Sequence, residues 1–280
     1  MAKDNSITAK DYPLFRIPLV MNSAGFILIP AYETETLNLK RVPTNIDIMV
    51  PTSSQEYPIG SQLWRGFERW VYIKAGEGLT IGGPVQSAPP VHADQQEDIG
   101  VAAAAAIGDT EIWLTSTSDL DGSPNETDNN FAGGFVHVND EAGEGQIIMI
   151  KANAAFGTTE DSLFKLYDKL AIALTTSSEC GLIKNPAYDV LKTKAVLTGK
   201  VMGVASVAFT DDYFGWLKYK GPCSVDMHAA VALGTKVVVG TTAVKADPAS
   251  CDTTEINLGE AMTPGITDGE KAIVWLNIGI

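Results

Sequence analysis

Alternation of apolar and polar positions runs along most of the chain and predicts strands rather than helices. The last third shows it most clearly, in runs at 194–209, 213–227, 229–244 and 271–280. Gly and Pro interrupt these runs about every ten residues, which is typical of a barrel or sandwich. We therefore expect an all-β fold, built as a small barrel or sandwich.

The middle of the chain continues this pattern in hairpins. Residues 69–74 alternate as a strand, 75–78 (AGEG) predict a turn, and 79–83 predict the start of a returning strand. Residues 131–152 (FAGGFVHVNDEAGEGQIIMIKA) hold two alternating runs around the loop 141–145. We expect this second segment to be a two-stranded hairpin whose glycines supply positive φ in the turn.

Residues 158–178 allow two interpretations. Leu163, Leu166, Tyr167 and Leu170 have helical spacing, with Asp161 as a possible cap. The alternative is a strand over 162–167, a turn at 167–169 and a second strand over 170–174. The threonines at both ends of the segment favour the strands.

Domain organisation follows from the distribution of prolines and of polar linkers. Residues 1–56 are rich in proline and predict an extended N-terminal arm, in which FILIP (26–30) and IDIMV (46–50) act as edge-strand anchors. The polar segment 84–99 predicts a linker. We expect residues 57–97 and 190–280 to form one β-barrel or sandwich domain, and 98–189 to form a β domain inserted into it.

Composition narrows the possible partners. The formal charge of the 280 residues is −14, and no basic patch stands out, so we expect no direct contact with nucleic acid. No apolar run is long enough to span a membrane, and the first residues lack the apolar centre of a signal peptide. Synthesis in a cytoplasm is therefore expected. Cys180, Cys223 and Cys251 are far apart, which favours reduced structural thiols.

Motifs for catalysis or for cofactors are weak throughout. The Gly-Glu-Gly at 143–145 precedes a strand and places a carboxylate where phosphate oxygens would lie, so it predicts a turn rather than a phosphate loop. The histidines at 92, 137 and 228 have no metal-ligand spacing, although His228 near Cys223 is a conceivable pair. Asp211–Asp212 precede an aromatic strand and are more typical of a turn than of paired catalytic acids. We expect no enzyme, no cofactor and no metal.

One stretch of the chain has part of the pattern of a calcium loop. The stretch from Asp119 to Ser123 resembles the opening of an EF-hand loop, but its twelfth position is Asn130 instead of a bidentate Glu. If calcium were bound, the ligands would be Asp119, Asp121, Glu126 and Asp128.

Two aromatic stripes remain to be explained. They lie at 64–72 and at 213–219. The first interpretation is that these rings pack in a core, the second is that they form an interface, and the third is that they stack on glycans. The candidate interface residues, taken from the arm and from these stripes, are Phe26, Ile27, Leu28, Ile29, Ile46, Ile48, Trp64, Trp70, Tyr213 and Trp216.

Three stretches of the chain carry a resemblance to known proteins. They are YPIGSQLWRGFERWVYIKAGEG (57–78), FAGGFVHVNDEAGEGQIIMIKAN (131–153) and TGKVMGVASVAFTDDYFGWLKYKGPCSV (198–225). Together they resemble virion proteins of tailed bacteriophages, of the head-decoration or cement type. The matching features are turns and aromatic residues rather than catalytic groups. The first sixty residues carry no part of the resemblance.

The resemblance implies a β-rich subunit on the exterior of a capsid. Such a subunit binds the major capsid protein, forms a homo-oligomer, with a trimer favoured, and cements neighbouring capsomers against the pressure of packaged DNA. The alternative is a virion appendage that attaches to host-surface glycans through the two aromatic stripes.

Overall fold

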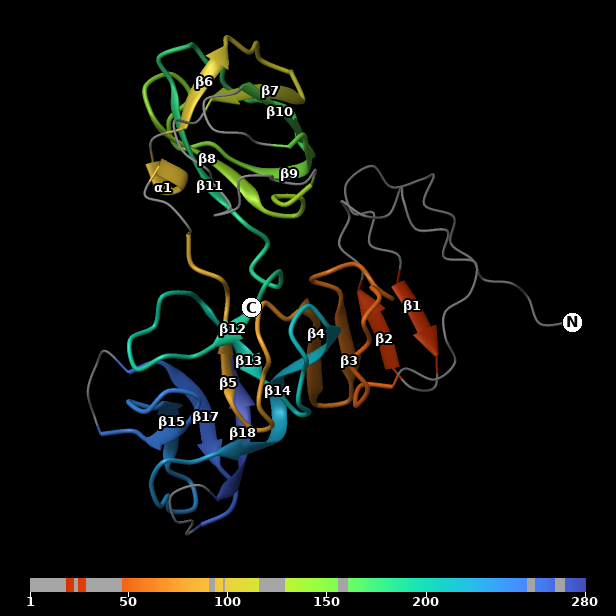
Figure 1. The fold of residues 1–280 in the computed structure, drawn as a ribbon, viewed down its shortest axis with the longest axis vertical. Coiled ribbons are helices and arrows are strands. Elements are labelled where there is room, and N and C mark those ends of the chain that lie inside the picture. Colours follow the sequence, from red (N-terminus) through yellow and green to blue (C-terminus); the bar gives the residue numbers. More distant parts are fainter. Residues whose placement is uncertain are drawn as a thin grey trace, which may run out of the picture.

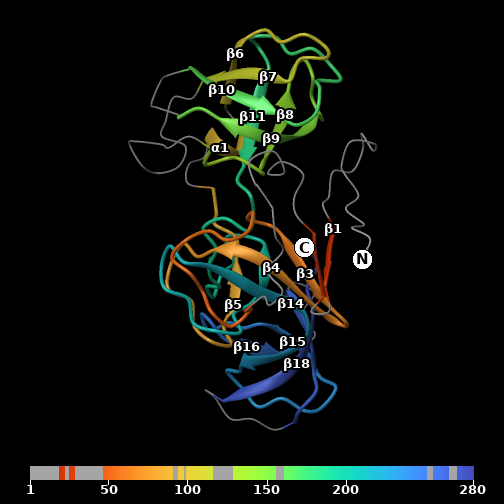
Figure 2. The same ribbon diagram turned by 90° about the vertical axis from the view of Figure 1, so that its right-hand side faces the viewer.

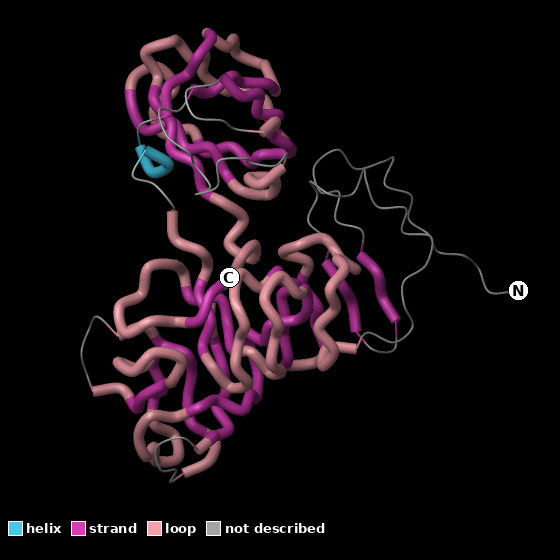
Figure 3. Tube along the Cα trace, viewed as in Figure 1, coloured by secondary structure: helices cyan, strands magenta, loops and turns pink. Residues whose placement is uncertain are grey.

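The computed structural model describes residues 19–22, 25–28, 47–90, 94–97, 99–115, 129–155, 161–250, 255–264 and 270–280; for 19–22, 25–28 and Asp94, only the backbone is described. Strands dominate these residues, as Figure 3 shows, so the all-β prediction is confirmed. The one helix described, α1 (Asp94–Glu97), has four residues. The described part of the chain therefore contains no helical membrane span.

A curled 12-stranded sheet forms the larger part of the molecule (Figure 1). Its main path runs β1-β2-β3-β4-β14-β18-β17-β15-β16, and β12, β5 and β13 branch from it. Their bounds are β1 Leu19–Asn22, β2 Gly25–Leu28, β3 Gln62–Arg65, β4 Glu68–Lys74, β5 Pro84–Gln86, β12 Leu191–Lys192, β13 Val201–Val204, β14 Phe214–Asp226, β15 Lys236–Val239, β16 Ala246–Pro248, β17 Asn257–Ala261 and β18 Lys271–Asn277.

The longest strand, β14, organises this sheet. Its first half pairs with β4, up to Lys220↔Arg69, and its second half pairs with β18, from Lys220↔Asn277 onward. A register shift between Lys218 and Lys220 marks a bulge where the two halves meet. On the edge opposite β4, β13 meets β14 at the single pair Val204↔Lys218. Strands β13 and β18 therefore lie one after the other on the same edge of β14. Away from β14, the two strands separate.

The second lobe is a closed barrel of the order β10-β7-β6-β11-β8-β9. Its strands are β6 Ile99–Ala103, β7 Glu111–Thr115, β8 Phe135–Asp140, β9 Ile147–Asn153, β10 Asp161–Leu166 and β11 Glu179–Ile183. Helix α1 lies against it, where the Gln95 side-chain amide donates to the Leu182 carbonyl. Figures 1 and 2 show the barrel as a separate lobe, entered after β5 and left after β11.

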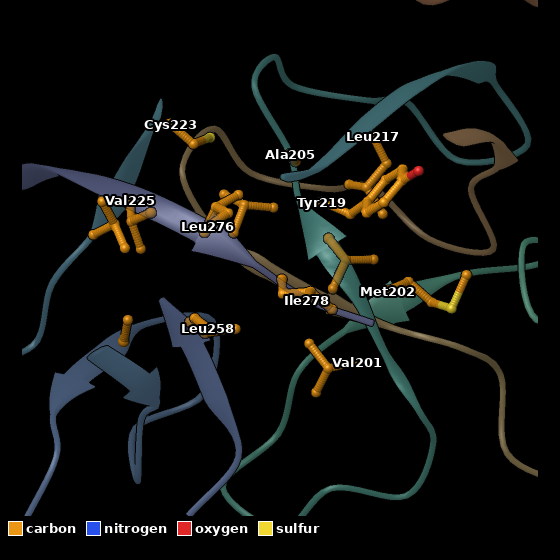
Figure 4. Packing of buried hydrophobic residues seen from close by; sticks show 14 of the residues in the cluster. Val201, Met202, Ala205, Leu217, Tyr219, Cys223, Val225, Leu258, Leu276 and Ile278 are labelled. Atoms are coloured by element: carbon orange, nitrogen blue, oxygen red, sulfur yellow. The ribbon is translucent and has the colours of Figure 1, made fainter. Parts of the chain in front are cut away.

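The two lobes have separate hydrophobic cores. The core of the curled sheet gathers Val, Leu, Ile and Met side chains from β4, β13, β14, β17 and β18. Figure 4 shows labelled side chains from the last four of these strands converging. The core of the barrel contains Ile99, Ile112, Leu114, Val138, Ile150 and Phe164, all buried. These inward-facing positions are the alternate residues of each strand, which is the period that the sequence shows.

The hairpin predicted over 131–152 is confirmed. Strands β8 and β9 pair antiparallel, with Val136 opposite Ile148 and Phe135 opposite Met149. In the turn, Gly143 and Gly145 have φ of 93° and 87°. Glycine adopts this region without steric cost, and its use here belongs to a turn.

The N-terminal segment contributes to the sheet, and part of its prediction is wrong. Strand β2 contains Phe26, Ile27 and Leu28 of FILIP and pairs with β3, while β1 pairs with β2 on its other side. In IDIMV, residues 47–50 form a turn instead of a strand. Ile48 packs on the aromatic residues beneath that turn. Ile29 and Ile46 lie outside the described residues.

Two further local predictions are also wrong. Residues 79–83 do not form a strand returning along β4; Leu79 makes one isolated bridge, to Phe209, and Gly82–Gly83 lie in a turn. The expected linker at 84–99 begins with a strand, because β5 is buried in the sheet and pairs with β12 and β13. Neighbouring strands, rather than local polarity, decided the structure of both segments.

In the ambiguous segment, the helical alternative is wrong for the described residues 161–178. Strand β10 pairs with β7 and β9. The expected second strand at 170–174 is reduced to an isolated bridge between Leu174 and Ala105. Residues 170–174 instead follow the rim of the barrel, where the Gln146 side chain accepts from the amides of Ala171 and Ile172.

Lys74, at the end of β4, joins two distant loops. Its ammonium lies 2.8 Å from Asp189 Oδ1 and 2.8 Å from Asp212 Oδ1, and 4.9 Å from the centre of the Tyr188 ring. Burial opposes the charge of Lys74, but the hydrogen bonds to the two carboxylates outweigh it and raise the pKa of the lysine. Both aspartates have positive φ, so this lysine holds two turns in strained conformations.

We expect Lys74→Met to lower the free energy of unfolding by about 2 kcal/mol, because it leaves two carboxylates without their shared cation. Urea denaturation measures the change. The matched control is Lys165→Met, whose ion pair with Glu111 is 3.9 Å long and exposed on both sides. That control is expected to change stability by no more than about 0.5 kcal/mol. Equal losses of unfolding free energy in the two variants would contradict the role of Lys74 as the cation that holds the two turns.

Candidate interaction surfaces

An aromatic cluster covers one face of β3, β4 and β14. It consists of Tyr57, Leu63, Trp70, Tyr72 and Trp216, all buried. The Tyr72 ring lies 5.1 Å from that of Trp216 and 5.3 Å from that of Tyr57, in edge-on or tilted geometry. Residue Tyr57 and the turn around Ile48 close the cluster from outside. These rings therefore pack in a core.

This burial corrects two of the candidate interface residues. Trp70 is 2% exposed and Trp216 is 3% exposed, so neither can touch a partner or stack on a sugar in this conformation. The Lys218 ammonium also packs on Trp70, with its Nζ atom 4.9 Å from the centre of the ring. Lys218 is itself buried and forms an ion pair with Glu68.

The other two aromatic candidates are half-buried. Trp64 lies under the Arg69 guanidinium at 4.2 Å and donates a hydrogen bond to the Gln62 side chain. The Tyr219 hydroxyl also donates to this glutamine oxygen. Trp64 therefore belongs to a small polar network at the end of the β3–β4 hairpin. Tyr213 lies in the turn before β14, where its backbone carbonyl accepts from the amide of Ala75.

A group of exposed apolar side chains lies on the outer face of β18 and at the tip of the neighbouring hairpin. Phe67 is 76% exposed at the tip of the β3–β4 hairpin, and its ring centre lies 5.9 Å from that of Trp275. Ile273 alternates with Trp275 along β18, and its carbonyl accepts from the amide of Met262. We call Phe67, Trp275, Ile273 and Met262 the Phe67 patch. Apolar surface of this kind on a folded sheet is typical of an interaction site.

Gly221 allows the Phe67 patch to form. A side chain at position 221 would lie 3.2 Å from the Phe67 carbonyl and from Glu68 Cα, and Gly221 has φ of 92°. The glycine thus lets the hairpin tip approach β14 and brings Phe67 to Trp275. Phe67 belongs to one of the predicted aromatic stripes. Trp275 was not singled out, although its position between Val274 and Leu276 marks it as outward-facing.

A groove of about 710 Å³ lies where β13 and β18 diverge. Its apolar wall is formed by Leu197, Val201, Val239, Ile256 and Ile278, and its polar rim by Lys200, Thr241, Ser250, Glu255 and Asn257. Figure 4 shows Val201 and Ile278 side by side at this point. The Glu255 carboxylate accepts from the amide and the hydroxyl of Ser250. Sequence patterns gave no sign of this groove, because it arises from a branch in the sheet.

Asp211, Asp212 and His228 form contacts within the fold. Asp212 pairs with Lys74, and Asp211 accepts from the backbone amide of Asp212. His228 Nδ1 lies 3.1 Å from Asp247 Oδ1, so its contact is an aspartate and not Cys223. Within the described residues, no group of His, Cys, Asp and Glu is arranged to hold a metal ion. His92 and the possible calcium ligands at 119, 121, 126 and 128 lie outside those residues.

Two cysteines are described, and both are buried free thiols in the strands β11 and β14. Burial, with a smaller effect of the Glu179 carboxylate, raises the pKa of Cys180 to about 12. Burial also raises the pKa of Cys223, which contacts the Ser206 hydroxyl at 3.8 Å. Both thiols are therefore protonated near neutral pH and belong to the cores.

Comparison with known proteins adds no assignment, since no family model, curated protein or solved structure matches this chain.

Removing a ring from the aromatic cluster should cost far more stability than removing one from the Phe67 patch. Trp70→Ala is expected to lower the free energy of unfolding by about 3–5 kcal/mol, through lost burial and a cavity. For Phe67→Ala we expect less than about 1 kcal/mol, since only its contact with Trp275 is lost. Urea denaturation of both variants measures the two changes. If Phe67→Ala lowers the free energy of unfolding as much as Trp70→Ala does, Phe67 is a core residue.

The aromatic cluster should also make the fold sensitive to alkali. Burial, followed by the nearby Glu56 and Tyr72 groups, raises the pKa of Tyr57 from 10.0 to about 12. The neutral phenol is thus favoured in the folded chain, so its contribution is complete below pH 10.0 and is lost as pH rises to about 12. The urea midpoint of unfolding should fall as pH rises through this interval, and it should fall less steeply in Tyr57→Phe. If the midpoint of that variant falls as steeply as that of the wild type, Tyr57 is not a source of the alkali sensitivity.

Proposed function

We propose that this protein is a structural component of a tailed-phage head. It binds the outer surface of the capsid, contacts the major capsid protein, and cements neighbouring capsomers. The three stretches that resemble decoration proteins support this role, and they contribute to both lobes. The described strands from these stretches are β3 and β4, β8 and β9, and β13 with most of β14.

The observation that carries the proposal is the Phe67 patch. Its residues come from a sheet whose other face is a packed core, so its shape is fixed before binding. A preformed apolar surface loses little conformational entropy on docking. Aromatic anchors of this kind provide much of the energy in protein interfaces. In the proposed role, this patch faces the shell, and a homotrimer presents it three times.

A glycan-binding appendage is less well supported. Stacking on a sugar requires exposed aromatic faces, whereas Trp70, Tyr72 and Trp216 of the two stripes are buried. Phe67 is the exposed ring of these stripes, and it lies against Trp275 in an otherwise aliphatic patch. Trp64 is already covered by Arg69. The structural role therefore remains the proposal.

The test uses phage particles that lack the protein, to which purified protein is added back. Wild-type protein should sediment with the particles and increase the fraction that stays intact under heat or low salt. Phe67→Glu should reduce this binding at least about tenfold, because it places a charge in an apolar contact. The control is Ile107→Glu, on an isoleucine of the barrel lobe that is 69% exposed, against 76% for Phe67.

Two results would contradict this account. If wild-type protein neither binds nor stabilises the particles, the proposed function is wrong. If Ile107→Glu abolishes binding while Phe67→Glu retains it, the protein docks through the barrel and the Phe67 patch has another role. Circular dichroism spectra that match the wild type confirm that both variants are folded.

A further inference from the structure

The groove between β13 and β18 has the features of a site for an added strand. Strand β13 pairs with β5 on one edge, but on its other edge it meets β14 at a single residue pair. Val201 of β13 lines the groove, together with Gly199 and Lys200 just before it, and the Lys200 backbone is already hydrogen-bonded to Ser87. An extended segment placed there can form main-chain hydrogen bonds with Gly199 and Val201 and can cover the apolar wall, which includes Ile256 at 46% exposure.

We infer that the occupant of this groove is the N-terminal segment of a second copy of the chain, residues 1–18. The inference rests on the proposed function for its biological meaning, since it names the contact through which copies of the cement protein join. It adds an exchange of segments between copies to the contact with the shell.

The sequence of this segment fits the groove. Residues 12–18 (YPLFRIP) combine four large apolar side chains with two prolines, and proline is unfavourable inside a helix. Segment 1–18 carries three basic and two acidic residues, or +1, so residues 19–280 carry −15. It is therefore attracted to the rest of an acidic chain. Arg16 is the natural partner of Glu255, whose half-buried carboxylate lies on the groove rim.

The sheet topology indicates that the segment comes from a second copy of the chain rather than from the copy that contains the groove. β1 and the groove lie on opposite sides of the sheet path, since β2, β3, β4 and β14 separate β1 from β13. Figure 1 shows this separation, with β1 at one side and β12–β15 at the other. Eighteen extended residues reach about 60 Å, enough to cross to a neighbour. A neighbour can present its groove without the segment having to turn back over its own sheet.

The first measurement is the mass of the full chain by light scattering. Wild-type protein should have the mass of at least two chains of 29.8 kDa each. Ile256→Glu, which puts a charge in the wall of the groove, should lower it to that of one chain. An excess of a synthetic peptide of residues 1–18 should do the same, by competing for the groove. The control Ile107→Glu makes the same substitution in the barrel and should leave the mass unchanged.

Cross-linking identifies which copy supplies the segment. When ¹⁴N- and ¹⁵N-labelled chains are mixed, an amine cross-linker should join Lys10 of one label to Lys200 of the other. Cross-links within one label alone would overturn the inference, as would a single-chain mass for the wild type. A multiple-chain mass that resists both Ile256→Glu and the peptide would also overturn it. No capsid is present in these experiments, so their outcome is separate from that of the particle-binding test.

Discussion

The bulge in β14 is the constraint on which the rest of the larger lobe depends. Between Lys218 and Lys220, the register of β14 against β4 shifts by one residue, and from Lys220 onward β14 also pairs with β18. The first half of the strand sends Trp216 into the aromatic cluster and Leu217 into the core of the curled sheet, while the second half sends Val225 into that core. One strand thus contributes to two cores on opposite faces, and the bulge is where it changes partners.

Two surfaces follow from this arrangement. Gly221, just after the bulge, lets the β3–β4 hairpin tip lie beside β18, which creates the Phe67 patch. Just before the bulge, β13 touches β14 at one pair and then diverges from β18, which creates the groove. The patch and the groove lie on the same lobe but involve different strands. A protein with two such surfaces is equipped to contact a shell through one and its own copies through the other, as we propose.

Sequence patterns predicted those parts of the fold whose cause is local. The hairpin at β8 and β9 could be predicted because its strands alternate and its glycines mark the turn between them. The period of two also predicted β4 and most of β14. Local patterns failed where a distant partner decides the structure. β5 lies in a proline-bearing, polar stretch, yet it is a buried strand because β12 and β13 pair with it on either side.

The candidate site was harder to predict for the same reason. An aromatic stripe in the sequence does not show which rings are covered. Trp70 is buried and lies under the Arg65 and Lys218 side chains, whereas Phe67, three residues earlier, is exposed. Trp275 contacts Phe67, although the two lie far apart in the sequence. Their contact depends on the register in which β14 pairs with β18, which local sequence patterns do not reveal. The groove has no sequence signal, because it is made by strands that fail to pair.

The central claim is our proposal that this protein is a component of a phage head. Its most direct test is an electron cryo-microscopy map of phage particles from the source of this sequence. The account predicts density for both lobes on the outer surface of the head, at junctions between capsomers, with the Phe67 patch against the shell. Density confined to the tail or its fibres, or a head on which that patch faces solvent, would contradict it.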